Sequence, residues 1–296
     1  MNSDKLIEKF NKINTWKSGG RSAPHKPLLL LWAIGRCQNN KSRMTTYSEV
    51  EIALRLLLNK FWPRETPHPE DPFWRLQNNH IWEVRPSELI ETTSSGSPKV
   101  SSLREHDAHG GFPEHIYSKL KSNPFLALEV VYSLLDSHFP ETYHADILNS
   151  VGIIEHQDEY VKRKPRNRGF SNLVLDAYEH RCAVCEFAIR IDDEPIGLEA
   201  AHIKWHSAKG PDIIGNALSL CALHHKLFDR GAFTLSDNQK IIVSNNARGA
   251  GWSDVLGKFD SRQIVPPKCR NHIPMLEYIE WHRRLIFRSS FHLAEN

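Results

Sequence analysis

The fold of the C-terminal part of this chain is decided by residues 180–231, HRCAVCEFAIRIDDEPIGLEAAHIKWHSAKGPDIIGNALSLCALHHKLFDRG. Cys182 and Cys185 form a C-x-x-C pair, and Cys221 and His224 form a C-x-x-H pair. The two pairs supply three thiolates and one imidazole, which is a ligand set that closes a tetrahedral zinc site. Because four protein ligands leave no open position, we expect a structural Zn²⁺ that stabilises a segment with few apolar residues.

Short elements around these ligands place the other polar residues. Two strands and a helix are expected, at residues 198–203 (LEAAHI), 217–220 and 222–229 (ALHHKLFD). Neighbouring residues on a helix point about 100° apart. His224 can therefore face the zinc ligands while His225 faces the strand that carries His202.

With these elements the segment resembles the HNH nuclease family, whose fold is called ββα-metal. The resemblance rests on His202, Asn216 and His225, framed by the four zinc ligands. It implies that His202 is the general base that takes a proton from the attacking water. It also implies that Asn216 orients the loop and the base, and that His225 binds a catalytic Mg²⁺ or Mn²⁺. Such an ion stabilises charge on the phosphoryl oxygens and on the leaving oxygen.

One position departs from the pattern of this family. Many relatives carry an acidic metal ligand directly before the first histidine, and here that position is Ala201. The second protein ligand of the catalytic ion is therefore open. Glu199, two residues before Ala201, is a candidate for it.

The N-terminal part is expected to be mainly helical. Apolar periodicity predicts helices at residues 4–13, 28–37, 48–62, 123–137 and 141–151, and a strand at 81–84. Ser48 and Glu51 have the spacing of a capping box for the third helix. That helix is expected to bury a face that includes Ile52, Leu56 and Phe61. The whole chain is thus expected to be an α+β protein.

Three N-terminal motifs carry a second resemblance. They are RSAPHKPLLLLWAI (21–34), FWPRETPHPEDPFWRLQNNHIWEV (61–84) and LREHDAHGGF (103–112). They are similar to the sulfur-binding domain that precedes an HNH domain in phosphorothioate-dependent restriction endonucleases. With the nuclease core, the similarity covers nearly the whole chain in the same order. It implies a sulfur-binding domain at 1–160, a basic linker at 161–170 and an HNH endonuclease domain at 171–296.

The second resemblance implies a substrate: double-stranded DNA in which sulfur replaces one non-bridging phosphate oxygen. Sulfur is larger and accepts hydrogen bonds more weakly than oxygen, so an apolar wall suits it better than it suits a charged phosphate oxygen. We expect Pro72 and Phe73 to form part of this wall. Charge or base contacts are expected from Arg21, His25, Lys26, Arg75 and Arg104.

Two of these segments have a plainer interpretation when composition is considered alone. Residues 21–26 precede a core helix, and cationic side chains at a helix N-terminus suit a phosphate. A solvated loop with no ligand fits the same composition. The proline-rich loop at 63–84 either packs against the core or lines a binding surface.

Bulk composition fits a globular DNA-binding protein. The 296 residues carry a net charge of +3, and residues 161–296 hold more Lys and Arg than Asp and Glu. The longest apolar run, Leu28–Ile34, is too short to span a bilayer, and the N-terminus lacks the apolar core of a signal peptide. We therefore expect a cytoplasmic protein without a membrane partner. Three of the five cysteines belong to the zinc site, so no disulfide framework is expected.

The sequence therefore predicts a type IV-like restriction endonuclease that cuts phosphorothioate-modified DNA. Because one HNH site cuts one strand, we expect a homodimer when both strands are cut. One alternative is an HNH endonuclease that reads methylated or unmodified DNA, with Trp74 or Trp82 forming an aromatic cage for a flipped base. The other alternative is a non-catalytic DNA-binding protein with a structural zinc.

Overall fold

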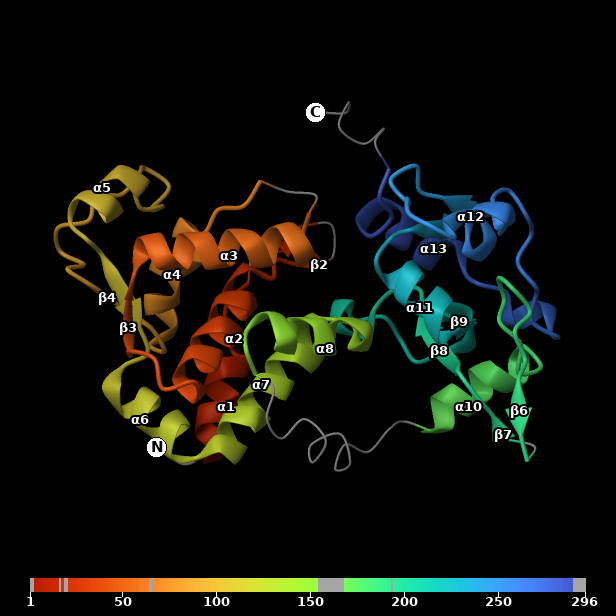
Figure 1. Cartoon of the computed structure of the whole chain (residues 1–296), viewed down its shortest axis with the longest axis horizontal. Helices are drawn as coiled ribbons and strands as arrows, with labels where there is room; N and C mark the ends of the chain where they lie inside the picture. The colour runs from red at the N-terminus through yellow and green to blue at the C-terminus, as the bar shows by residue number, and fades with distance from the viewer. Residues whose placement is uncertain are drawn as a thin grey trace. The chain divides into compact units, whose positions relative to one another are not determined.

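The computed structural model describes residues 3–15, 17–18, 21–63, 66–153, 168–192 and 194–289. Internal contacts divide the chain into two units, residues 1–164 and residues 165–296 (Figure 1). Most of the predicted basic linker, from residue 161 to 167, lies outside the described residues. A helix begins at Arg168, inside the range assigned to the linker from the sequence.

Helices dominate the N-terminal unit. Its helices are α1 (Ser3–Asn11), α2 (His25–Gln38), α3 (Tyr47–Phe61), α4 (Glu70–Arg75), the 3₁₀ helix η1 (Leu76–Asn79), α5 (Val100–Glu105), α6 (Glu114–Ser122), α7 (Pro124–His138) and α8 (Glu141–Ser150). Its strands are β1 (Lys17–Ser18), β2 (Arg21–Ser22), β3 (Met44–Thr46), β4 (Glu83–Arg85) and β5 (His109–Gly111).

The core of this unit forms around α2. Leu28, Leu29, Leu30 and Leu31 are all fully buried, as expected for a helix that is apolar on every side. The helices α3, α4, α6 and α7 contact α2 (Figure 1). The helix begins at His25, three residues before the predicted start, so His25 and Lys26 lie in its first turn rather than in a preceding loop.

A three-stranded antiparallel sheet in the order β3-β5-β4 completes the unit. Its central strand contributes Gly110, where an added Cβ would lie 2.5 Å from the ring of Phe73. Phe73 packs edge-on against Tyr47, with ring centroids 5.2 Å apart, and against Trp82 at 6.2 Å. The proline-rich loop therefore packs against the core in the region of α4.

The start and the buried face of α3 differ from the prediction. The N-cap is Thr46, whose hydroxyl accepts a hydrogen bond from the Glu49 backbone N–H at 3.2 Å. Strand β3 ends at this residue and gives it the extended backbone that an N-cap requires. The predicted capping box of Ser48 and Glu51 is therefore wrong.

The same shift changes which residues of α3 face the core. Val50, Leu54, Leu57, Leu58 and Phe61 are buried, at spacings of three and four residues. Ile52 and Leu56 are 66% and 67% exposed, so two members of the predicted apolar face point outward instead. Periodicity alone allowed both faces, and only packing against the neighbouring elements selects one.

Shorter elements build the C-terminal unit. Its helices are α10 (Arg168–Ala177), η2 (His206–Ala208), η3 (Ile214–Asn216), α11 (Ala222–Asp229), α12 (Trp252–Val255), η4 (Gly257–Phe259), η5 (Arg270–His272) and α13 (Leu276–Leu285). Its strands are β6 (Arg190–Ile191), β7 (Glu194–Pro195), β8 (Leu198–His202), β9 (Ala217–Cys221), β10 (Phe233–Leu235) and β11 (Ile241–Val243).

The ββα arrangement predicted from the sequence is confirmed. Strands β8 and β9 pair antiparallel, with Leu198 opposite Cys221 at one end and His202 opposite Ala217 at the other. Helix α11 follows β9 directly and contacts both strands. It ends before Gly231, which has a φ of +69° and lies so close to the Ile286 carbonyl that an added Cβ would be 2.1 Å from its oxygen.

Buried side chains from these elements form one cluster. Ala201 and Leu218 from the strands and Phe228 from α11 are fully buried, and α10 packs on them through Val174. The antiparallel hairpin of β10 and β11 adds Phe233, Leu235 and Ile241 to the cluster. None of the described helices is both long enough and apolar enough to span a membrane.

The corrected helix cap can be tested by paired substitutions. Thr46→Ala removes the side-chain acceptor at the start of α3 and is expected to cost about 1 kcal/mol of stability. Ser48→Ala, the matched control, is expected to change stability by less than about 0.5 kcal/mol because Ser48 is exposed inside the helix. Calorimetry of the full chain measures both, and a larger loss for Ser48→Ala would restore the predicted capping box.

Candidate functional site

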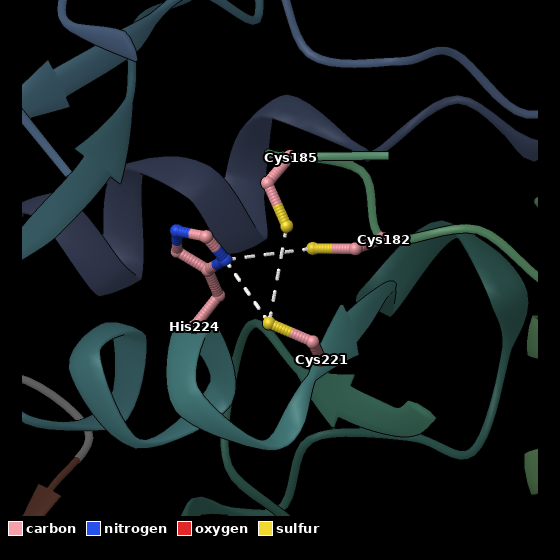
Figure 2. A group of neighbouring side chains, drawn as sticks. All are labelled: Cys182, Cys185, Cys221 and His224. Atoms are coloured by element: carbon pink, nitrogen blue, oxygen red, sulfur yellow. Dashed lines mark hydrogen bonds between the residues drawn. The ribbon is translucent and has the colours of Figure 1, made fainter. Parts of the chain in front are cut away.

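Four donor atoms converge at one end of the β8–β9 hairpin. The ligand atoms of Cys182, Cys185, Cys221 and His224 all lie within 4.8 Å of one another (Figure 2). The Cys185 and Cys221 sulfurs are 4.0 Å apart, close to the spacing of about 3.8 Å that bonds of about 2.3 Å give in a tetrahedral thiolate site. The residues predicted as metal ligands are thus brought together around one point.

The fold brings the two cysteine pairs together by backbone contacts. After α10 the chain makes a tight turn in which the Cys182 N–H donates to the Phe187 carbonyl at 3.0 Å. The next residue, Ala183, donates its N–H to the Ser219 carbonyl of β9 at 2.7 Å. This bond ties the turn to the strand that ends in Cys221. The two pairs are far apart in sequence, and this hydrogen bond holds the first pair against the strand that leads into the second.

The His224 ring is held in the orientation that a metal ligand needs. Its Nε2 contacts the Val255 carbonyl oxygen at 2.9 Å, so Nε2 carries the proton and donates it. The other nitrogen, Nδ1, lies 3.1 Å from the Cys221 sulfur and 3.7 Å from the Cys182 sulfur. A carbonyl acceptor behind a metal-binding imidazole is a common second layer of metal sites.

The protonation chemistry of this cluster also fits a cation. Burial lowers the pKa of His224, but the three neighbouring cysteine sulfurs raise it more strongly, to about 12. The site therefore favours a positive charge between the sulfurs. A metal ion supplies that charge when it displaces the proton, which couples metal binding to the folding of the unit.

A second cluster surrounds His225 on α11. Its Nδ1 lies 2.7 Å from Oε2 of Glu199 on β8, and its Nε2 lies 3.3 Å from Oδ2 of Asp229 one turn further along the helix. Asp229 is only 2% exposed and also accepts a hydrogen bond from the Trp205 indole N–H at 3.0 Å. A buried carboxylate is stable only with such partners, so Asp229 holds the ring of His225 in place.

His202, at the end of β8, has a carboxylate partner of its own. Its Nε2 lies 2.9 Å from Oδ1 of Asp212, and its ring stacks on Phe170 with centroids 4.7 Å apart. Burial lowers the pKa of His202, while the hydrogen bond and charge of Asp212 act in the opposite direction. The imidazole is consequently neutral at neutral pH and can accept a proton.

Asn216 is fully buried and staples the loop between β8 and β9. Its side-chain oxygen accepts from the Lys204 N–H at 2.9 Å, and its amide donates to the Lys204 and Pro211 carbonyls at 3.0 Å each. Three bonds from one side chain use most of its hydrogen-bonding capacity. These contacts are those expected of a residue that orients the loop.

The prediction that His224 and His225 point in different directions is confirmed. His224 faces the cysteine sulfurs, and His225 faces Glu199 on the strand that also carries His202. Sequence reasoning missed Asp229 and Asp212. Asp229 lies four residues after His225, on the same helix face, so helical spacing was a usable signal. Asp212 lies ten residues from His202 in an irregular loop, where no spacing rule applies.

Two of the predicted DNA-contacting cations lie together in the N-terminal unit. Burial lowers the pKa of Lys26, and the charge of Arg75 lowers it further. The Lys26 ammonium donates to Asn79 Oδ1 at 3.0 Å. Arg75 is held by Asp71 at 2.9 Å and by the carbonyl of Ser95 at 3.1 Å. The charge of Arg75 therefore acts on Lys26, and an anion beside them would offset this repulsion.

The other predicted contacts of this unit have different surroundings. Phe73 is fully buried in the core and Pro72 beside it is buried as well, and their part in an apolar wall for sulfur stays a prediction. Arg104 pairs with Glu51 on α3 at 2.8 Å. Arg21 lies in β2, but its side chain lies outside the described residues.

Comparison with known families gives two matches. Residues 3–156 match the ScoMcrA-like DNA sulfur-binding domain family, which is more than half of the chain. Residues 182–236 match an HNH endonuclease family. No curated protein matches the chain.

Solved structures are similar to the chain over about half of its length. The sulfur-binding domain of ScoMcrA complexed with phosphorothioated DNA is 27% identical, with a TM-score of 0.46, covering 50% of this chain and 95% of that one. The type IV phosphorothioation-dependent restriction endonuclease ScoMcrA is 27% identical, with a TM-score of 0.46, and the match covers 50% of this chain but only 32% of that one. The modification-dependent TagI restriction endonuclease is 26% identical, with a TM-score of 0.31, covering 46% of this chain and 41% of that one.

The four-donor cluster makes a direct prediction. Cys182→Ser removes one sulfur, and we expect the purified protein to lose its bound metal and the C-terminal unit to melt at a lower temperature. Cys269→Ser, an exposed cysteine outside the cluster, is the matched control and should keep both properties. Elemental analysis and calorimetry measure them. Equal metal content in the two variants would show that the cluster is not a metal site.

Proposed function

The chain belongs to the ScoMcrA-like DNA sulfur-binding domain family, and from this membership we propose that it binds phosphorothioate-modified DNA and cuts it. The observation that carries the proposal is the pairing of that domain, at residues 3–156, with an HNH endonuclease domain at residues 182–236. The first domain supplies recognition, and the second supplies hydrolysis of a phosphodiester bond. We accordingly assign the protein to the type IV-like restriction endonucleases.

We assign zinc to the four-donor cluster. Three thiolates and one imidazole are soft to intermediate donors, which suit Zn²⁺ far better than Mg²⁺ or Mn²⁺. The site would be closed by its own ligands, so the role of the ion is structural. It would link the turn at Cys182 and Cys185 to the start of α11 at Cys221 and His224.

Glu199 and His225 are the residues we assign to a catalytic Mg²⁺ or Mn²⁺. The carboxylate and the imidazole nitrogen are 2.7 Å apart and come from different elements, β8 and α11. Asp229 holds the opposite nitrogen of the ring, which leaves Nδ1 on the Glu199 side. Glu199 thereby replaces the acid that relatives carry at the position of Ala201. When bound, the ion stabilises charge on the phosphate and on the leaving oxygen.

His202 is the residue we assign as the general base. A neutral imidazole takes a proton from water as the water oxygen bonds to phosphorus, and the bond between phosphorus and the leaving oxygen breaks. The charged groups acting on His202 include Asp229, which also contacts His225. Asn216 would keep the loop between the strands closed around the base.

Recognition of DNA would involve Lys26 and Arg75. A phosphate bound between these two cations would offset the repulsion between their positive charges. His25 lies beside Lys26 in the first turn of α2, where backbone N–H groups also favour an anion. Pro72, which lies in the same helix α4 as Arg75, remains our prediction for the apolar contact to sulfur.

The alternative of a methylated-base reader is disfavoured by one observation. Trp82 is 3% exposed and packs against Phe73 and Phe112, so it cannot open into an aromatic cage without breaking the core. Trp74 is only partly buried and leaves the alternative open in principle. Binding to plain, methylated and phosphorothioated duplexes separates the two proposals.

Cutting of plasmid DNA tests the proposed function. We expect the full chain with Mg²⁺ or Mn²⁺ to cut a plasmid that carries phosphorothioate links and to leave the unmodified plasmid intact. His202→Ala should reduce the rate by about a hundredfold or more, because the general base is lost. His272→Ala in η5 is the matched control and should cut normally. Equal cutting of both plasmids would contradict the proposed recognition of phosphorothioate and would still support the nuclease activity.

Binding measurements test the role of Lys26. Lys26→Ala should weaken binding of modified and plain duplexes alike and reduce the slope of log affinity against log salt by about one. Lys12→Ala, whose charge is already paired with Glu8, should leave the slope unchanged. A slope unaffected by Lys26→Ala would mean that this ammonium does not contact a phosphate.

We also propose a homodimer, because the described residues contain one HNH motif and a double-strand break needs two cuts. Each chain would then supply one active site to one strand. Sedimentation velocity should show a dimer when the protein is bound to modified DNA. A monomer in both the free and the bound state would contradict the proposal. The cytoplasmic location stays a prediction from the sequence.

A further inference from the structure

The described residues place an acidic side chain against the ring of His202, the residue that we assign as the general base. Asp212 Oδ1 lies 2.9 Å from His202 Nε2. We propose that Asp212 is a positioning residue for catalysis, which fixes the proton of His202 on Nε2 and leaves Nδ1 as the proton-accepting atom. This inference rests on the proposed nuclease function and adds a residue to its site.

The chemistry of the pair determines the tautomer. An ionised carboxylate can only accept hydrogen bonds, and a neutral imidazole has one donor nitrogen and one acceptor nitrogen. With Asp212 at Nε2, the donor is Nε2 and the lone pair is on Nδ1. A histidine–carboxylate pair of this kind also stabilises the imidazolium that forms when the base accepts its proton.

The ring has a second restraint that acts in another direction. Phe170 of α10 stacks on the His202 ring at a centroid distance of 4.7 Å and an interplanar angle of 25°. Stacking limits tilting of the ring, and the hydrogen bond to Asp212 limits rotation about the Cβ–Cγ bond. Together they hold Nδ1 in one direction before any substrate arrives, which is the geometric requirement for a general base.

The position of Asp212 is itself controlled by Asn216. The Asn216 amide donates to the carbonyl of Pro211, the residue directly before Asp212, and it also bonds to both backbone groups of Lys204. Gly210 allows this closure, because an added Cβ there would lie 1.8 Å from the Lys204 oxygen. Asn216 therefore acts on the base through the loop and Asp212.

A simple surface ion pair is a weaker account of this contact. The Asp212 side chain is 37% exposed, and exposed pairs contribute little to stability. The stacking partner and the stapled loop are both built around the same two side chains. The other charged groups acting on His202 are His206, which lowers its pKa, and Asp229, which raises it. Asp212 is the one that makes a hydrogen bond to the ring among the described contacts.

The first measurement uses the cutting rate as a function of pH. Asp212→Asn should lower the rate by about tenfold to a hundredfold. Because the Asp212 charge raises the pKa of His202, its removal should move the acidic limb of the pH profile to lower pH. Asp212→Glu, which keeps the charge, should restore much of the rate. Asp192→Asn, an exposed aspartate in the β6–β7 turn, is the matched control and should behave as the wild type.

Comparison with Glu199→Gln separates positioning from metal binding. That variant should raise the concentration of Mg²⁺ or Mn²⁺ needed for cutting and leave the acidic limb in place. Asp212→Asn should do the reverse. If Asp212→Asn raises the metal requirement without moving the limb, Asp212 is a metal ligand and the inference is wrong. An unchanged rate and limb would overturn it as well.

The second measurement does not depend on cutting. Long-range ¹H–¹⁵N spectra of the full chain, with the His202 signals assigned by their loss in His202→Ala, should show the proton on Nε2 at neutral pH. A proton on Nδ1 would overturn the inference. If the wild type cuts neither plasmid, the proposed function fails, and the tautomer still decides whether Asp212 sets the ring.

Discussion

The C-terminal unit depends on the convergence of three thiols and one imidazole within 4.8 Å. Three ionised thiols this close would repel one another, and a cation among them would remove that repulsion. The unit needs such a link, because its strands are short and its sheets have only two strands each among the described residues. Two-stranded hairpins are at best marginally stable alone. The cluster joins the turn after α10 to the start of α11, and it thereby sets the place of the helix on the hairpin.

The β8–β9 hairpin positions the proposed catalytic residues relative to the four-donor cluster. Its register places Cys221 of the four-donor cluster at one end and His202 at the other end, four residues along β8 from Leu198. Helix α11 spans the strands and presents His224 to the cluster and His225 to Glu199. The proposed structural and catalytic centres are therefore held by the same two strands and one helix. A change that loosens the cluster should disturb both, although neither centre shares a ligand with the other.

The two units divide the chemistry between them. The N-terminal unit has two cations, Lys26 and Arg75, that are held by the neutral side chain of Asn79 and the acidic side chain of Asp71. In the C-terminal unit His202, His224 and His225 each have a ring nitrogen that contacts a carboxylate or a carbonyl. The first arrangement suits binding of an anion, and the second suits transfer of a proton beside a metal ion. Recognition of modified DNA and hydrolysis of its backbone are thus assigned to different units of the chain.

The sequence by itself determined what depends on local spacing. The four-donor cluster follows from two x-x spacers, the different directions of His224 and His225 follow from helix geometry, and the buried core helix follows from a run of leucines. Tertiary structure decided what depends on packing between distant segments. Thr46 caps α3 because β3 ends there, and Phe73 is core because the sheet covers it. Asp212 reaches His202 because the side chain of Asn216 holds the irregular loop between them in place. The hydrogen bonds that set the path of this loop cannot be predicted from a periodic sequence pattern.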